Sequence, residues 1–128
     1  MLMTVLQVAL GGAIGASGRY LSGVAILRIF GLQPMPLGVI FVNILGSFLM
    51  GLLVVFLGQK QMTHLNPLLA TGILGGFTTF SSFSLETWTL IERGDTALAA
   101  AYVGLSVSAG LLGLVAGIYA MRAILGAA

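Results

Sequence analysis

The chain has 128 residues, contains no cysteine and carries very little charge. Without cysteine it can form neither a disulfide nor a thiolate site, and its one histidine lacks partners for the common metal sites. Charged residues make up 6% of the sequence, whereas soluble domains carry about a quarter. Three acids and one histidine supply too few acids, bases and nucleophiles for an enzyme. The net charge of +2 is too sparse for a surface that binds nucleic acid.

What the sequence does contain is long apolar stretches. Hydrophobic residues make up 59% of the chain, and the mean hydropathy is +1.14. The stretches without Asp, Glu, Lys or Arg are 1–18, 29–59, 61–85 and 96–121. Because roughly 20 apolar residues cross a bilayer as a helix, each stretch can supply one membrane helix. We predict an all-α, multi-pass membrane protein with one transmembrane domain over 1–128 and helices at about 4–28, 36–58, 67–92 and 96–122.

The few cations outside the predicted helix interiors do not favour one orientation in the membrane. With four helices, Lys60 and Arg122 fall on one side and Arg28 and Arg93 on the other. Orientation follows an excess of Lys and Arg in short loops, and two against two gives no excess. We therefore predict insertion in both orientations, with two opposite copies paired as an antiparallel homodimer. The alternative is a weak bias that partners or lipids fix.

Small residues recur four positions apart in three of the predicted helices. The pairs are Gly11 and Gly15, Gly72 and Gly76, Ser106 and Gly110, and Gly113 and Gly117. Such pairs let helix backbones approach closely in lipid, where no hydrophobic effect drives helices together. They indicate tight packing and do not specify a function.

The third predicted helix contains an unusual polar stretch, LGGFTTFSSFSLETW, at residues 74–88. Gly75 and Gly76 lie near its middle, where a helix break requires new partners for the freed backbone groups. The hydroxyl of Thr78 or Thr79 can cap the helix that restarts. We predict that the third helix is broken near its middle into two half-helices joined by an unwound segment, an arrangement found in ion-handling membrane proteins.

The second half-helix combines hydroxyl and phenyl groups. At 3.6 residues per turn, one face holds Phe80, Phe83, Ser84 and Thr87, and the adjoining face holds Thr79, Ser82 and Glu86. Phenyl rings are positive at their edges, so ring edges and hydroxyls can line a path for an anion. Simple packing is the alternative explanation, because hydroxyls also bond to the preceding helical turn.

Isolated polar residues in the other helices could extend such a path. Asn43 supplies an amide in the second helix, and Ser106 and Ser108 supply hydroxyls in the fourth. Arg19 lies well inside the first helix, where a charge is costly. We therefore treat Arg19 as a candidate functional residue. It would draw anions toward a vestibule, or it would form a salt bridge with Glu86.

These segments resemble a known family. GGFTTFSSFSLE resembles the third-helix signature of the Fluc (CrcB) fluoride channels, and GAIGASGRY, VNILGSFLMG and AAAY resemble other segments of that family. The resemblance covers nearly all of the chain. It implies a dual-topology, antiparallel homodimer in the cell inner membrane, with two parallel pores that export fluoride passively.

The resemblance also implies roles for individual residues. For the anion path it implies Phe80, Phe83, Asn43, Ser81, Ser84, Tyr102 and Ser108. The vestibule residues, Arg19 and Glu86, are predicted from their own positions in the helices and not from the resemblance. The backbone carbonyls of Gly75 and Thr78 from both subunits would hold one structural sodium ion on the twofold axis. One departure is Val39, which stands where the family often has Thr and so provides no hydroxyl.

Two other functions remain open at the level of sequence. A small dual-topology exporter of cationic drugs also has four helices, but it needs a membrane carboxylate early in the chain, and only Glu86 is available. A non-conducting assembly subunit would need only the small-residue pairs, and it would not need the hydroxyl-rich face.

Overall fold

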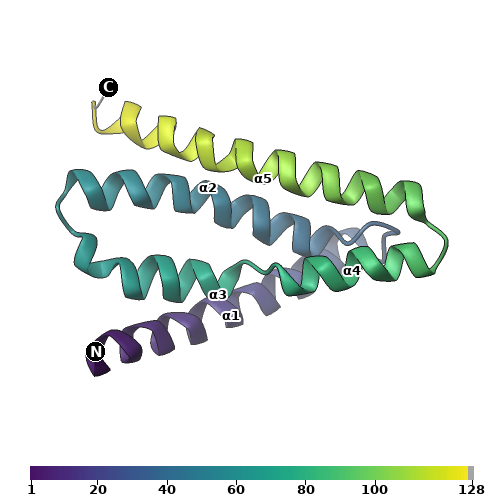
Figure 1. Ribbon diagram of the computed structural model, residues 1–128, viewed down its shortest axis with the longest axis horizontal. Coiled ribbons are helices and arrows are strands. Elements are labelled where there is room, and N and C mark those ends of the chain that lie inside the picture. Colours follow the sequence, from purple (N-terminus) through teal and green to yellow (C-terminus); the bar gives the residue numbers. More distant parts are fainter. Residues whose placement is uncertain (127–128) are drawn as a thin grey trace.

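Every regular element of the computed structural model, which describes residues 1–126, is a helix. The elements are α1 (Leu2–Phe30), α2 (Leu37–Gln59), η1 (Thr63–Leu65), η2 (Pro67–Leu74), α3 (Gly75–Phe77), α4 (Ser81–Glu92) and α5 (Thr96–Ile124). The chain runs back and forth along its long axis, so α1 begins at the same end of the molecule at which α5 finishes (Figure 1). The prediction of an all-α fold is confirmed for the described residues.

Three helical segments are long and apolar enough to cross a membrane. They are Leu37–Gln59, Thr63–Glu92 and Thr96–Ile124. The remaining long helix, α1, has 29 residues, but Gln7, Arg19 and several glycines lower its hydropathy. The protein is therefore a multi-pass membrane protein with at least these three segments as candidate spans.

Glycine and proline mark the ends of the helices. Gly31 ends α1 with a φ of +69°, and Gly94 follows α4 with a φ of +86°, a left-handed conformation that favours glycine. Pro36 directly precedes α2, and Pro67 occupies the first turn of η2, where its missing N–H costs nothing. The element η2 is a π-helix, with wider turns than an α-helix.

Two crossings of glycine-containing helices hold the bundle together. A Cβ built on Gly72 of η2 would lie 2.8 Å from the Cα of Gly11 in α1. A Cβ on Gly117 of α5 would collide with the carbonyl oxygen of Phe48 in α2. Real Cβ atoms do not come so close to a backbone, so only glycine fits at these crossings. The small-residue pair Gly72 and Gly76 therefore serves close packing against α1, as predicted.

One cluster of buried side chains lies toward the end of the bundle opposite the start of α1. Ile40 of α2, Leu90 of α4, and Ala99 and Tyr102 of α5 form one apolar cluster. Many other large apolar side chains remain exposed in the single chain, including most of those along the outer surface of α1. Lipid or another protein chain must cover such a surface.

Candidate functional site

The helical path of the third span is interrupted between α3 and α4. Thr78 has an extended conformation, with φ −86° and ψ 161°, and α4 begins at Ser81. The sequence placed the unwound segment at Gly75 and Gly76, and this detail is wrong, because both residues belong to α3. Gly76 is required for close packing, since a Cβ there would lie 2.8 Å from the carbonyl oxygen of Gly12 in α1. A Cβ on Gly75 would make only an ordinary contact, 3.5 Å from the Ala70 carbonyl oxygen.

Asn43 of α2 holds the interrupted segment. Its amide Nδ2 donates to the carbonyl oxygen of Thr79 at 2.9 Å, and its Oδ1 accepts from the Thr79 N–H at 2.8 Å. The hydroxyl of Thr79 in turn accepts from the N–H of Ser82 at 3.1 Å, which caps the start of α4. The sequence predicted the cap, but it gave no sign that Asn43 would pair with the backbone.

These bonds release two carbonyl groups from their usual helical donors. In an α-helix the Gly75 carbonyl would accept from the Thr79 N–H, and the Thr78 carbonyl from the Ser82 N–H. Both donors bond elsewhere, to Asn43 and to the Thr79 hydroxyl. The neutral oxygens of Gly75 and Thr78 are thus available to a hard cation, which prefers oxygen ligands. No group of three or more His, Cys, Asp or Glu side chains that could hold a metal occurs among residues 1–126.

Arg19 stabilises the same region from α1. Its Nε donates to the carbonyl oxygen of Gly76 at 3.2 Å. The sequence left open a salt bridge between Arg19 and Glu86, and among the described residues the only salt bridge is instead between Arg93 and Asp95. Arg19 and Glu86 nevertheless line one cavity of about 640 Å³, together with Thr79 and Ser82.

This cavity opens between three parts of the chain. Its walls come from the second half of α1, the loop at residues 31–36 with the start of α2, and the polar side of α4. Val39 is part of the wall, so an apolar side chain stands where a hydroxyl was expected from the resemblance. The cavity thus brings one cation and one carboxylate together at the edge of the interrupted segment.

Three aromatic rings form a row beside the interruption. The ring centroids of Phe80 and Phe83 are 5.6 Å apart, and those of Phe83 and Tyr102 are 5.3 Å apart. The hydroxyl of Tyr102 then donates to Oε2 of Glu86 at 3.0 Å. Phe80 is 79% exposed, whereas Tyr102 is fully buried. The row therefore runs from the surface of the chain to the half-buried Glu86 carboxylate, which lines the cavity between α1 and α4.

Four hydroxyls of the third span bond to the preceding helical turn, including that of Thr89, which donates to the carbonyl of Leu85. Ser84 donates to the carbonyl of Phe80 at 3.0 Å, Thr87 to that of Phe83 at 2.8 Å, and Thr78 to that of Leu74 at 3.0 Å. The hydroxyl of Ser81 lies 3.4 Å from that of Thr79. An anion that used these donors would have to displace their present acceptors.

In α5 the structure distinguishes two serines that the sequence treated alike. Ser108 is exposed, and it lies six positions after Tyr102, on another face of the helix. Ser106 lies one turn after Tyr102 on the same face and is buried, and its Oγ has no hydrogen-bond partner among residues 1–126. The spacing of four from Tyr102 is the sequence signal that selects Ser106 over Ser108.

Comparison with known proteins gives a consistent result. A family model described as CrcB-like protein, Camphor Resistance (CrcB), matches residues 6–118. A protein named Fluoride-specific ion channel FluC from Ruegeria sp. (strain TM1040) is 58% identical over 125 residues, which cover 98% of this chain and 99% of that protein. Its namesake from Cereibacter sphaeroides (strain ATCC 17029 / ATH 2.4.9) is 58% identical over 122 residues, 95% of this chain and 97% of that protein. Another, from Caulobacter sp. (strain K31), is 46% identical over 123 residues, 94% and 95% of the two chains.

Proposed function

We propose that this chain, which belongs to the CrcB-like protein family, is a fluoride-specific ion channel that exports fluoride passively across the cell inner membrane. The resemblance first seen in the third-helix motif is thus confirmed at the level of the family. The family is one of ion channels, so the protein is not an enzyme.

The row of rings from Phe80 to Tyr102 is the observation that best supports a route for the ion. Fluoride is small and strongly hydrated, so a pore must replace its water with many donors, each weak enough to release it. The positive edges of Phe80 and Phe83 meet this need without a fixed charge. The row begins at an exposed ring and ends at the buried hydroxyl of Tyr102.

Polar groups next to the row would complete the path. Asn43 uses one amide hydrogen on Thr79, which leaves its second hydrogen for an anion. Ser106 carries a buried hydroxyl that lacks a partner, and a passing anion or water would satisfy it. Ser81 and Ser84 are exposed beside Phe80 and would contribute by turning from their present partners. Ser108 takes a lesser part in this proposal, because it faces away from Tyr102.

The cavity between α1 and α4 would serve as the vestibule. Arg19 would raise the local concentration of anions there, and its bond to Gly76 keeps the guanidinium at the cavity wall, outside the row of rings. Glu86 lines the same cavity, and its carboxylate would hold Tyr102 in place at the end of the row of rings.

A second copy of the chain would cover the exposed side of α4. Phe80, Ser81 and Ser84 are exposed in the middle of a span that is long enough to cross the membrane. Backbone and hydroxyl groups at such depth are tolerated where protein or a water-filled path surrounds them. We propose an antiparallel homodimer with two parallel pores. Each subunit would cross the membrane four times, with α1 as the first span, and its third span would be broken between α3 and α4.

One sodium ion would lie at the centre of that dimer. The carbonyls of Gly75 and Thr78 have lost their helical donors, and two subunits would supply four such oxygens. Four neutral oxygens without a carboxylate suit a monovalent cation more than a divalent one. The ion would neutralise the carbonyl dipoles and so stabilise the contact between subunits.

Fluoride efflux from liposomes tests the proposal. Purified protein in potassium fluoride liposomes should release fluoride rapidly when valinomycin balances the charge, as a fluoride electrode records. The same liposomes loaded with chloride should release little. Release that required a proton gradient would instead indicate a carrier, and an absence of release would favour the assembly subunit.

A further inference from the structure

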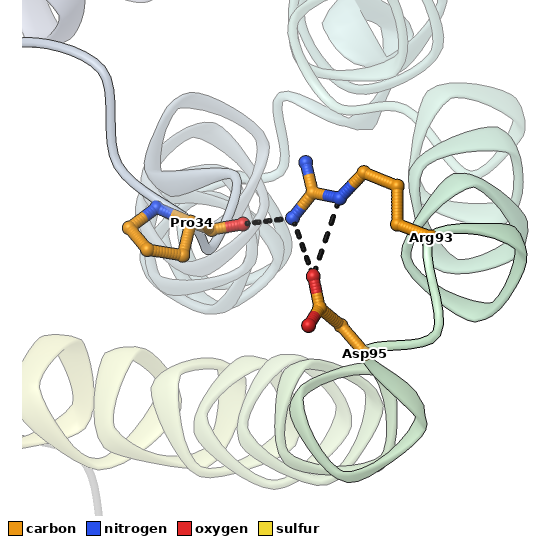
Figure 2. A network of polar contacts seen from close by, with 3 residues as sticks. All are labelled: Pro34, Arg93 and Asp95. Carbon is orange, nitrogen blue, oxygen red and sulfur yellow. Dashed lines mark hydrogen bonds and ion pairs between the residues drawn. The ribbon is translucent and has the colours of Figure 1, made fainter.

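The two ends of the bundle differ in charge balance. At the end away from the start of α1, Arg93 binds the Asp95 carboxylate at 2.9 Å and the Pro34 carbonyl at 3.4 Å (Figure 2). Figure 2 shows that this contact ties the turn after α4 to the loop between α1 and α2. All three acids of the chain lie on α4 or in this turn.

At the other end, cations stand without acids. Lys60 follows α2, and Arg122 lies in the last turn of α5. Among residues 1–126 neither forms a salt bridge. These cations are also not required as hydrogen-bond donors at the end of α2. The carbonyls of Phe56, Leu57 and Gly58 already accept hydrogen bonds from backbone N–H groups. In the part of the chain that the structure describes, this end therefore carries positive charge without an acidic partner at the point where two candidate membrane spans finish.

A groove lies between α2 and α5 at the same end. It encloses about 300 Å³ and is lined by Val54, Val55, Gly58, Gln59, Ile118 and Arg122. Its lining is apolar except for the side-chain amide of Gln59 and the guanidinium of Arg122. A Cβ built on Gly58 would meet nothing within 4 Å, so the groove is open beside this glycine.

An aromatic residue supports the guanidinium. The Arg122 Cζ lies over the ring of Tyr119, 5.8 Å from its centroid. Tyrosine at the end of a membrane helix is typical of the level of the lipid headgroups. A guanidinium at that level, with no carboxylate partner among the described residues, has the geometry to bind a phosphate with two N–H groups.

We propose that this groove binds an anionic phospholipid. Its phosphodiester would accept hydrogen bonds from Arg122 and from the side-chain amide of Gln59, and one acyl chain would lie along Val54, Val55 and Ile118. Lys60 would add attraction for the negative headgroup. The inference depends on the membrane location of the chain and does not depend on which ion it conducts.

Native mass spectrometry of the full-length protein in detergent tests the proposal. The protein is titrated with dioleoyl phosphatidylglycerol or with dioleoyl phosphatidylcholine, which differ only in headgroup. Both lipids carry the phosphodiester, but in phosphatidylcholine a choline cation offsets its charge. We therefore expect phosphatidylglycerol to bind about tenfold more tightly. Arg122→Gln should abolish that preference, and Gly58→Leu should weaken binding of both lipids because its side chain fills the groove.

The matched control is Arg28→Gln, which removes a cation from the opposite end and should leave lipid binding unchanged. Size-exclusion elution and helix content by circular dichroism establish that each variant is folded. Equal affinity of the wild-type protein for the two lipids would overturn the proposal. So would equal losses in Arg122→Gln and Arg28→Gln, or unchanged binding in Gly58→Leu. Displacement of the lipid by inorganic phosphate would show a site for free anions instead, and the absence of bound lipid would also overturn the proposal.

Discussion

The side chain of Asn43 forms both hydrogen bonds that the backbone of Thr79 makes, at 2.9 and 2.8 Å. It thereby replaces, from α2, the partners that a continuous third helix would provide. A carboxamide is the one kind of side chain that offers a donor and an acceptor side by side in this way. The interruption of the third span thus depends on a residue 36 positions earlier in the sequence.

The pairing of Asn43 with Thr79 predicts that Asn43 affects stability as well as transport. Asn43→Leu removes both bonds, and Asn43→Asp replaces the donor with a second acceptor that faces the Thr79 carbonyl. We expect each change to lower the free energy of unfolding by about 1–3 kcal/mol, the cost of buried groups left unpaired. Thermal unfolding in detergent measures this. Ser47→Ala is the control, because Ser47 lines the same cavity. If Asn43→Leu unfolds like the wild type, the pairing is unimportant.

The two phenylalanine rings beside the interruption can be tested separately from their packing. Phe80→Leu and Phe83→Leu keep most of the apolar volume but remove the positive ring edge. We expect fluoride efflux to fall at least tenfold, about 1.4 kcal/mol in the barrier, with dimer assembly retained. Ser82→Ala should cost less, since Ser82 lies on the adjoining face.

Phe41→Leu is the matched control for the rings. Phe41 lies on α2, is partly exposed, and lines an apolar surface hollow away from the row. The same substitution there should leave efflux unchanged. Normal efflux in both Phe80→Leu and Phe83→Leu would show that the rings only fill space.

The glycine crossings predict opposite effects for neighbouring glycines. A Cβ on Gly15 would collide with the Ile73 carbonyl, and one on Gly117 with the Phe48 carbonyl. Alanine at either position should lower stability by about 1–3 kcal/mol through forced backbone shifts. Gly12, in α1 like Gly15, and Gly104, in α5 like Gly117, have no atom within 4 Å of a built Cβ. Alanine there should leave thermal stability equal or slightly higher, because alanine favours helix. A similar loss at all four positions would contradict the crossing geometry.

The balance of cations predicts two orientations in the membrane. Reporters fused after α5 should be found on both sides. Thr63→Lys with His64→Lys adds two charges to the loop after α2, and should bias insertion toward one orientation. Leu32→Lys with Gln33→Lys adds them to the loop after α1, and should bias insertion the other way. Either double variant should lose efflux alone and recover it when the two are expressed together. A single orientation of the native chain would refute the antiparallel dimer.

The released carbonyls predict a requirement for sodium. We expect dimers to persist in sodium and to dissociate when N-methylglucamine replaces it, as analytical ultracentrifugation would show. Since backbone oxygens would hold the ion, Thr78→Ala should matter little. Gly75→Val should weaken assembly, because a branched side chain crowds the exposed carbonyl. Equal dimer stability in sodium and in N-methylglucamine would argue against the sodium site.

The sequence predicted the helices well because hydropathy and charge are local properties. The second and fourth spans, expected at 36–58 and 96–122, are occupied by Leu37–Gln59 and Thr96–Ile124. It also singled out Asn43 and Arg19 as unusual, since a polar group in an apolar run is visible without coordinates. Their partners were not predictable, because both side chains bond to backbone atoms of another segment. Backbone groups are the same at almost every position, so the sequence does not show which of them will be a partner.

The position of the interruption was predicted wrongly for a related reason. Gly75 and Gly76 suggested flexibility, yet Gly76 is required for close contact with α1. What unwinds the chain is Thr79, whose N–H and hydroxyl both find partners outside the helix ladder. A glycine has two separate uses in a membrane helix, and the sequence alone does not tell them apart.

The π-helix η2 has a consequence for how the length of this chain can vary. In a π-helix each N–H bonds to the carbonyl five residues earlier, so its turns hold more residues than α turns do. Pro67–Leu74, which itself contains the crossing with α1 at Gly72, therefore holds more residues than an α-helix of the same length. We expect a deletion of one residue near Leu68 to be absorbed by conversion to α geometry, with Gly72 and Thr79 kept in phase with their partners. A deletion after Leu74 has no π-helical turn that could convert to α geometry. Tolerance to single-residue deletions should therefore be high within Pro67–Leu74 and low directly after it.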